Sequence, residues 1–196
     1  RLFVTADRSW PTTWVHVRFL LRHFIVSGLL TRPGHHCIHA VVALGPTSAG
    51  PRQGLLVAGP SGSGKTRLVN RLVEQGVVSG VVEDDCAVID SDWGLISLMP
   101  TEHELRRPQR LEVGAVVLLD ADASAPEALS PRAAADFAAR CPTPWPARWL
   151  PGATPRRARM SDPPPALRAL RVPARSDTDD AVLEAVAQLT ASTVGM

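Results

Sequence analysis

The chain has 196 residues, of which 45% are hydrophobic and 20% charged, and a net charge of +2 at neutral pH. This length predicts one domain with a substantial core, and so small a net charge argues against nucleic acid or a membrane surface as a partner. The cysteines are odd in number and form no C-x-x-C spacing, which predicts a reducing, cytoplasmic environment with neither a disulfide framework nor a zinc site. No signal peptide is visible, and charged residues interrupt the apolar stretch 14–30, so we expect no membrane span.

The first part of the chain has the pattern of a helix followed by a hairpin of strands. Apolar residues at helical spacing predict a helix over residues 12–31. Short apolar runs predict strands over 37–43 and 54–58, and the turn-rich residues between them predict a hairpin. We therefore expect a helical lead-in over residues 1–34 and one domain over 35–196.

The only lysine of the chain, Lys65, lies in a glycine-rich loop that follows the second predicted strand. The loop matches the phosphate-binding pattern G-x-x-x-x-G-K-[ST] at every position, and its residues are Gly59, Pro60, Ser61, Gly62, Ser63, Gly64, Lys65 and Thr66. Glycines let backbone amides point at phosphates, Lys65 supplies a positive charge, and the Thr66 hydroxyl is a ligand for Mg²⁺. A helix is predicted over residues 66–76, ending at Gly76. The order of strand, glycine loop and helix predicts that this loop binds a nucleotide.

The rest of the chain alternates strand patterns with two further helices. The expected elements are two short strands around Glu83–Asp85, a turn at 90–92, strands over 94–99, 113–119 and 167–172, and helices near 131–140 and over 177–193. Ser176 and Asp179 form a candidate capping box for the last helix. Residues 121–165 are rich in proline and arginine and predict a mostly irregular segment. The whole pattern predicts an α/β class with a P-loop nucleotide-binding domain.

A nucleotide site also needs acidic side chains to hold Mg²⁺ and to accept a proton. Asp84 and Asp85 follow one short apolar strand, whereas Asp120 ends a longer one in the form of a Walker B acid. An aspartate at the end of a strand can also simply begin a turn. From the residues alone, the choice between these candidates stays open.

Three motifs, in this order, resemble the catalytic domain of HPr kinase/phosphorylase and its serine-kinase-like relatives. They are His39-Ala40-Val41-Val42, the glycine loop, and Val81-Val82-Glu83-Asp84-Asp85. The resemblance covers roughly residues 35–100. It implies an α/β fold of the HPr-kinase/PEP-carboxykinase-like type, with a central mixed sheet flanked by helices.

The resemblance implies a role for each matching residue. Lys65 and the loop amides would hold the phosphates of ATP, and Thr66 and Asp85 would bind Mg²⁺. Asp84 would act as the base toward an acceptor hydroxyl, and His39 would lie near the transferred phosphoryl group.

Residues after position 100 give information on phosphate binding and on the phosphoryl acceptor. Val172-Pro173-Ala174-Arg175 resembles the family's late Pro/Arg segment, which makes Arg175 a candidate phosphate contact. The family's glycine-rich signature is not recognisable in residues 101–165, which favours an acceptor other than HPr. HPr kinases are oligomeric, so the resemblance also allows a homo-oligomer.

The leading prediction is therefore an ATP-dependent, Mg²⁺-requiring kinase that transfers the γ-phosphoryl group to a hydroxyl. The acceptor would be a seryl group of a protein or peptide, or a small hydroxylated molecule. One alternative is a P-loop ATPase with Asp120 as its Walker B acid. Another is a nucleotide-binding regulatory module without turnover.

Overall fold

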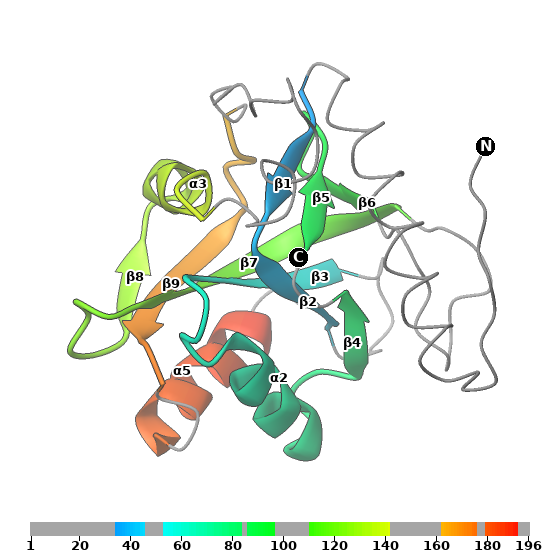
Figure 1. Ribbon diagram of the computed structural model, residues 1–196. Helices are drawn as coiled ribbons and strands as arrows, with labels where there is room; N and C mark the ends of the chain where they lie inside the picture. The colour runs from blue at the N-terminus through cyan, green and yellow to red at the C-terminus, as the bar shows by residue number, and fades with distance from the viewer. Residues whose placement is uncertain are drawn as a thin grey trace, which may run out of the picture.

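A computed structural model describes residues 34–45, 53–83, 86–96, 110–141, 162–175 and 179–191. The helix expected over 12–31, the acidic pair Asp84 and Asp85, and Ser176 lie outside the described residues. Within the described residues, the chain is an α/β structure in which three helices pack on a mixed sheet of nine strands (Figure 1).

Most of the elements expected from the sequence are present. The strands are β1 (His36–Ile38), β2 (Ala40–Leu44), β3 (Gln53–Ala58), β4 (Gly80–Glu83), β5 (Ala87–Ile89), β6 (Gly94–Ile96), β7 (Arg110–Asp120), β8 (Glu127–Leu129) and β9 (Arg168–Pro173). The helices are α2 (Lys65–Glu74), α3 (Pro131–Ala138) and α5 (Asp180–Ala191). Three details differ from expectation: the strand predicted over 37–43 is interrupted at His39, the strand predicted over 113–119 begins earlier, at Arg110, and β8 lies in the segment expected to be irregular apart from one helix.

The long strand β7 organises the sheet. It pairs in parallel with β3 along one edge, while its other edge is shared between β6, which is antiparallel, and β9, which is parallel. β2 pairs antiparallel with β3, so the predicted hairpin is confirmed, and β4 pairs with the far side of β2. Because β3, β7 and β9 are parallel, their carboxyl ends meet at one edge of the sheet, where ligands bind in open α/β folds. The glycine loop leaves β3 at this edge.

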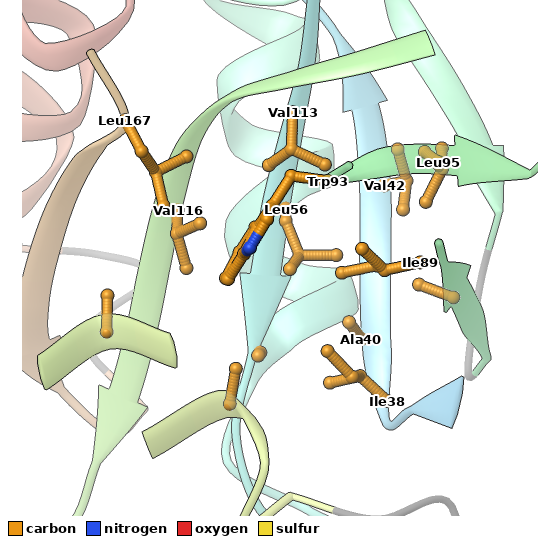
Figure 2. Close-up of a cluster of buried hydrophobic side chains, with 14 of the residues drawn as sticks. Ile38, Ala40, Val42, Leu56, Ile89, Trp93, Leu95, Val113, Val116 and Leu167 are labelled. Carbon is orange, nitrogen blue, oxygen red and sulfur yellow. The ribbon is translucent and has the colours of Figure 1, made fainter. Parts of the chain in front are cut away.

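The sheet separates two hydrophobic layers. Helices α2 and α5 cover one face with leucines and valines, and α3 covers the other face with its buried alanines Ala134, Ala135 and Ala138 (Figure 1). Figure 2 shows the layer on the α3 side, where the indole of Trp93 lies beside Leu56 and Val116. Because the buried side chains that α3 contributes are small, residues of the strands supply most of this layer.

The ends of the helices follow local sequence signals. Gly76 has φ 71° just beyond α2, which confirms it as the stop of that helix. Ser130 caps α3, its hydroxyl accepting the N–H of Ala133 at 3.2 Å. In α5 the expectation differs: Asp179, expected as the third residue of a capping box begun by Ser176, is itself the cap, because its carboxylate accepts the N–H of Ala181 at 3.0 Å and α5 begins at Asp180. No helix in the described ranges is long and apolar enough to cross a membrane.

Candidate functional site

The glycine loop, residues 59–66, connects β3 to α2 through two left-handed positions. Gly62 has φ 77° and Gly64 has φ 99°, values that residues with a Cβ rarely adopt. Between them, the N–H of Ser63 donates to the carbonyl of Pro60 at 3.2 Å. The carbonyl of Gly64 then accepts the N–H of Leu68 and begins α2. The loop therefore ends with the amino end of α2 facing its interior, an arrangement that favours anions.

Gly59 is required for a different reason, a close approach of the loop to β7. A Cβ at this position would lie 2.8 Å from the carbonyl oxygen of Leu119 and 2.9 Å from the Ser63 Oγ. Leu119 belongs to the central strand, so its carbonyl cannot easily move away. The absence of a side chain at Gly59 therefore lets the loop cross the carboxyl end of β7.

Replacing Gly59 by alanine should displace the loop and weaken ligand binding. We expect the Gly59→Ala variant to lose about tenfold or more in affinity for ATP, the ligand that the sequence predicts for the loop. The steric clash should also lower the free energy of unfolding by about 1–3 kcal/mol. Gly80→Ala is the matched control, because a Cβ there meets open space. Calorimetric titration and urea unfolding measure the two effects. Equal behaviour of the two variants would contradict the role given to Gly59.

Two buried polar side chains lie inside the loop. Lys65 is only 5% exposed, and its Nζ donates to the carbonyls of Gly59 at 3.1 Å and Pro60 at 3.0 Å. Ser63 is 6% exposed, and its hydroxyl has no hydrogen-bond partner among the described residues. A buried hydroxyl left unsatisfied costs about 1–3 kcal/mol. A hydrogen bond from this hydroxyl to a ligand oxygen would remove that cost.

Arg175, two residues beyond the end of β9, contacts the loop although it is far away in the sequence. Its backbone N–H donates to the carbonyl of Ser63 at 2.7 Å, and its Nε lies 3.5 Å from the carbonyl oxygen of Gly62. The residue is exposed and has φ 61°, a left-handed conformation that is strained for a non-glycine residue. The structure thus brings this candidate phosphate contact to the loop.

His39 lies at the break between β1 and β2 and is buried. Its backbone N–H, not its imidazole, donates to the backbone carbonyl of Cys141 at 2.8 Å, just beyond α3. Burial raises the pKa of the Cys141 thiol, whereas the positive charges of Lys65 and Arg140 act to lower it. Cys141 therefore lies within electrostatic reach of the loop lysine, and no motif in the sequence pointed to it.

Asp120 ends β7 and is held by β9. Its Oδ2 accepts from the Nε and Nη2 of Arg171 at 2.9 and 2.8 Å, and its Oδ1 accepts the N–H of Asp122 at 3.1 Å. The Asp122 amide, and after it Arg171, hold the pKa of the Asp120 carboxyl below its usual value, although partial burial acts to raise it. These contacts begin a turn and join two strands. They give Asp120 a structural role.

This ion pair should make stability depend on pH in the acid range. Because the folded pKa of Asp120 is lowered, its contribution is present above the unfolded pKa and is lost as pH falls through the folded value. We expect Asp120→Asn to lower the free energy of unfolding by about 1 kcal/mol at pH 7 and by progressively less below about pH 4. Urea unfolding from pH 7 to pH 3 measures this difference.

The control for this experiment is Asp136→Asn. Asp136 is exposed and pairs with Arg132 along one helix at 2.9 Å, so its removal should change the free energy of unfolding by less than about 0.5 kcal/mol. A constant difference between the Asp120→Asn variant and the unmodified protein at every pH would contradict the assignment.

The metal-binding candidates lie partly beyond what the structure describes. Thr66 is exposed in the first turn of α2, whereas Asp84 and Asp85 lie outside the described residues. No group of three histidine, cysteine, aspartate or glutamate side chains within the described ranges could hold a metal ion. Comparison with known proteins adds no assignment, because no family model and no curated protein matches this chain.

Proposed function

We propose that the protein is an ATP- and Mg²⁺-dependent kinase of the HPr-kinase-like type, built on a P-loop nucleotide-binding domain. It would transfer the γ-phosphoryl group to a seryl hydroxyl of a protein or peptide, or to a small hydroxylated acceptor. The observation that carries the proposal is the glycine loop, with the Lys65 ammonium and the unsatisfied Ser63 hydroxyl both buried at the amino end of α2.

Phosphate binding follows from the contacts inside the loop. The Lys65 ammonium now donates to two carbonyls of the loop itself, and it would exchange these neutral acceptors for charged phosphate oxygens. Hydrogen bonds between charged groups are shorter and about twice as strong as neutral ones, which favours the exchange. Arg175 stands beside the same loop and would add a second positive charge on the β9 side.

The transfer step is proposed from the resemblance. Asp84 would orient the acceptor hydroxyl and take its proton, and His39 would lie near the transferred group. Thr66 and Asp85 would hold Mg²⁺, which supplies charge neutralisation when it is bound. Catalysis of this kind depends mainly on positioning and electrostatics, and a loop held close to β7 at Gly59 suits it.

The test is transfer of label from γ-labelled ATP in the presence of Mg²⁺. The substrates are seryl peptides, small hydroxylated compounds and cell extract, and the proteins are the unmodified chain, Lys65→Ala and Asp84→Asn. We expect label on an acceptor only with the unmodified protein, while Asp84→Asn keeps its affinity for ATP. Equal labelling with all three proteins would overturn the proposal.

The same assay distinguishes a kinase from the two alternatives, an ATPase and a regulatory module without turnover. Asp120 ends the strand that lies parallel to β3, which is the position of a Walker B acid, so an ATPase remains the second candidate. Steady release of phosphate without any acceptor would identify an ATPase. ATP binding with neither release nor transfer would identify a regulatory module.

A further inference from the structure

Two of the three cysteines, separated by 49 positions in the sequence, meet at the edge of the sheet. Cys37 lies in β1 and Cys86 directly precedes β5, and their Sγ atoms are 2.8 Å apart. The antiparallel pairing of β1 with β5 causes this approach, since Cys37 stands opposite Val88, two residues beyond Cys86. All three cysteines are thiols in this structure. Their spacing in the sequence gave no indication of such a pair.

We propose that Cys37 and Cys86 form a thiol–disulfide exchange site that reacts with low-molecular-weight disulfides such as oxidised glutathione. A disulfide bond is about 2.05 Å long, so the two sulfur atoms need to approach by less than about 1 Å. The strand pairing already holds their backbones together, so little chain entropy is lost when the bond forms. In a reducing compartment, a thiol pair of this kind serves reversible oxidation rather than permanent crosslinking.

The burial of the two thiols sets the order of the reaction. Cys37 is half-buried and Cys86 is buried, so the small disulfide reaches Cys37 first. The Cys37 thiolate attacks one sulfur of the disulfide and forms a mixed disulfide, and the leaving thiolate takes up the proton that Cys37 lost. The Cys86 thiolate then attacks the Cys37 sulfur and releases a second small thiol, which takes the Cys86 proton. Two protein thiols are oxidised, and one small disulfide is reduced to two thiols.

A disulfide between Cys37 and Cys86 would close a covalent loop of chain that contains the glycine loop. The segment between the two cysteines contains β2, β3, the loop, α2 and β4, and it begins beside His39 and ends beside Asp85. Closing a loop of this length restricts the unfolded chain, so we expect oxidation to raise the Tm by about 5 °C or more. The exchange itself does not rest on the proposed kinase activity.

The experiment treats the folded protein with oxidised glutathione and counts the remaining thiols. We expect two of three thiols to disappear, and non-reducing peptide mapping to show the Cys37 and Cys86 peptides linked. Dithiothreitol should restore all three thiols and the original Tm. The Cys141→Ala variant is the matched control, and it should form the same linkage because it keeps both partners.

The variant Cys86→Ser tests the order of attack. Without the second thiol, glutathione should remain attached to Cys37, whereas Cys37→Ser should form neither the adduct nor the linkage. Because the linkage is first sought in the unmodified protein, a variant that fails to fold does not decide the outcome. Three remaining thiols, a lasting glutathione adduct on the unmodified protein, or a linkage through Cys141 would each overturn the proposal.

Discussion

Replacing Lys65 by methionine is expected to reduce the affinity for ATP by about 100-fold or more. Methionine keeps most of the buried hydrocarbon stem of the lysine but removes the ammonium that contacts the carbonyls of Gly59 and Pro60. In the proposed complex this ammonium would pair with phosphate oxygens of ATP. Truncating one partner of a buried, hydrogen-bonded charge pair costs about 2–5 kcal/mol, and each 1.4 kcal/mol corresponds to about tenfold in affinity. No other lysine exists in the chain to replace it. Isothermal titration with ATP and Mg²⁺ measures the change.

The matched control for this variant is Arg71→Met on the same helix. Arg71 is exposed and forms an ion pair with Glu74 at 2.7 Å, so its replacement removes one positive charge from α2 without touching the loop. An exposed pair contributes less than about 1 kcal/mol, and we expect ATP affinity within about twofold of the unmodified protein. Similar losses for both variants would indicate a general effect of charge and would contradict a specific role for Lys65.

The parts of the fold that depend on local rules could be predicted from the sequence. The glycine loop and α2 follow from residues that stand next to one another, because Gly62, Gly64 and Gly76 occupy positions of positive φ. The β2–β3 hairpin is equally local. Each of these features needs only the conformational preferences of a short segment, so the sequence alone predicts it.

The contacts that complete the candidate site are not local, and nothing in the sequence showed them. Arg175 reaches the carbonyl of Gly62 across 113 positions because β9 pairs with β7, which pairs with β3. The contact of His39 with Cys141 depends on where α3 packs. The order of strands in a sheet is set by the packing of the whole core, so a one-dimensional pattern can propose His39 and Arg175 but cannot say which residues they meet.

The break in the strand at His39 has a similar cause. Residues 37–43 are apolar apart from His39, and this pattern predicts one strand. In the structure, β1 pairs with β5 while β2 pairs with β3 and β4, so the chain must change partners between them. His39 stands at that change, and its N–H, released from the sheet, donates to Cys141 instead.

The largest effect on stability is expected at Trp93, away from the loop. Trp93 is 1% exposed and is among the largest buried side chains of the described core (Figure 2). Replacing a buried tryptophan by alanine costs about 3–5 kcal/mol, a large part of the 5–15 kcal/mol (roughly) that stabilises a typical domain. Urea unfolding should show this loss for Trp93→Ala, while Val73→Ala on the exposed side of α2 should change the free energy of unfolding by less than about 1 kcal/mol.

The left-handed backbone at Trp93 leads to a second prediction, on which of two small replacements at this position is the more stable. Trp93 has φ 60° at the end of the turn in which the Asp90 carboxylate accepts the N–H groups of Asp92 and Gly94. A left-handed conformation costs about 1–2 kcal/mol for a residue with a Cβ and almost nothing for glycine. Trp93→Gly should therefore be at least as stable as Trp93→Ala, although glycine is usually the less stable of the two. A Trp93→Gly variant clearly less stable than Trp93→Ala would show that this turn does not hold position 93 in the left-handed region.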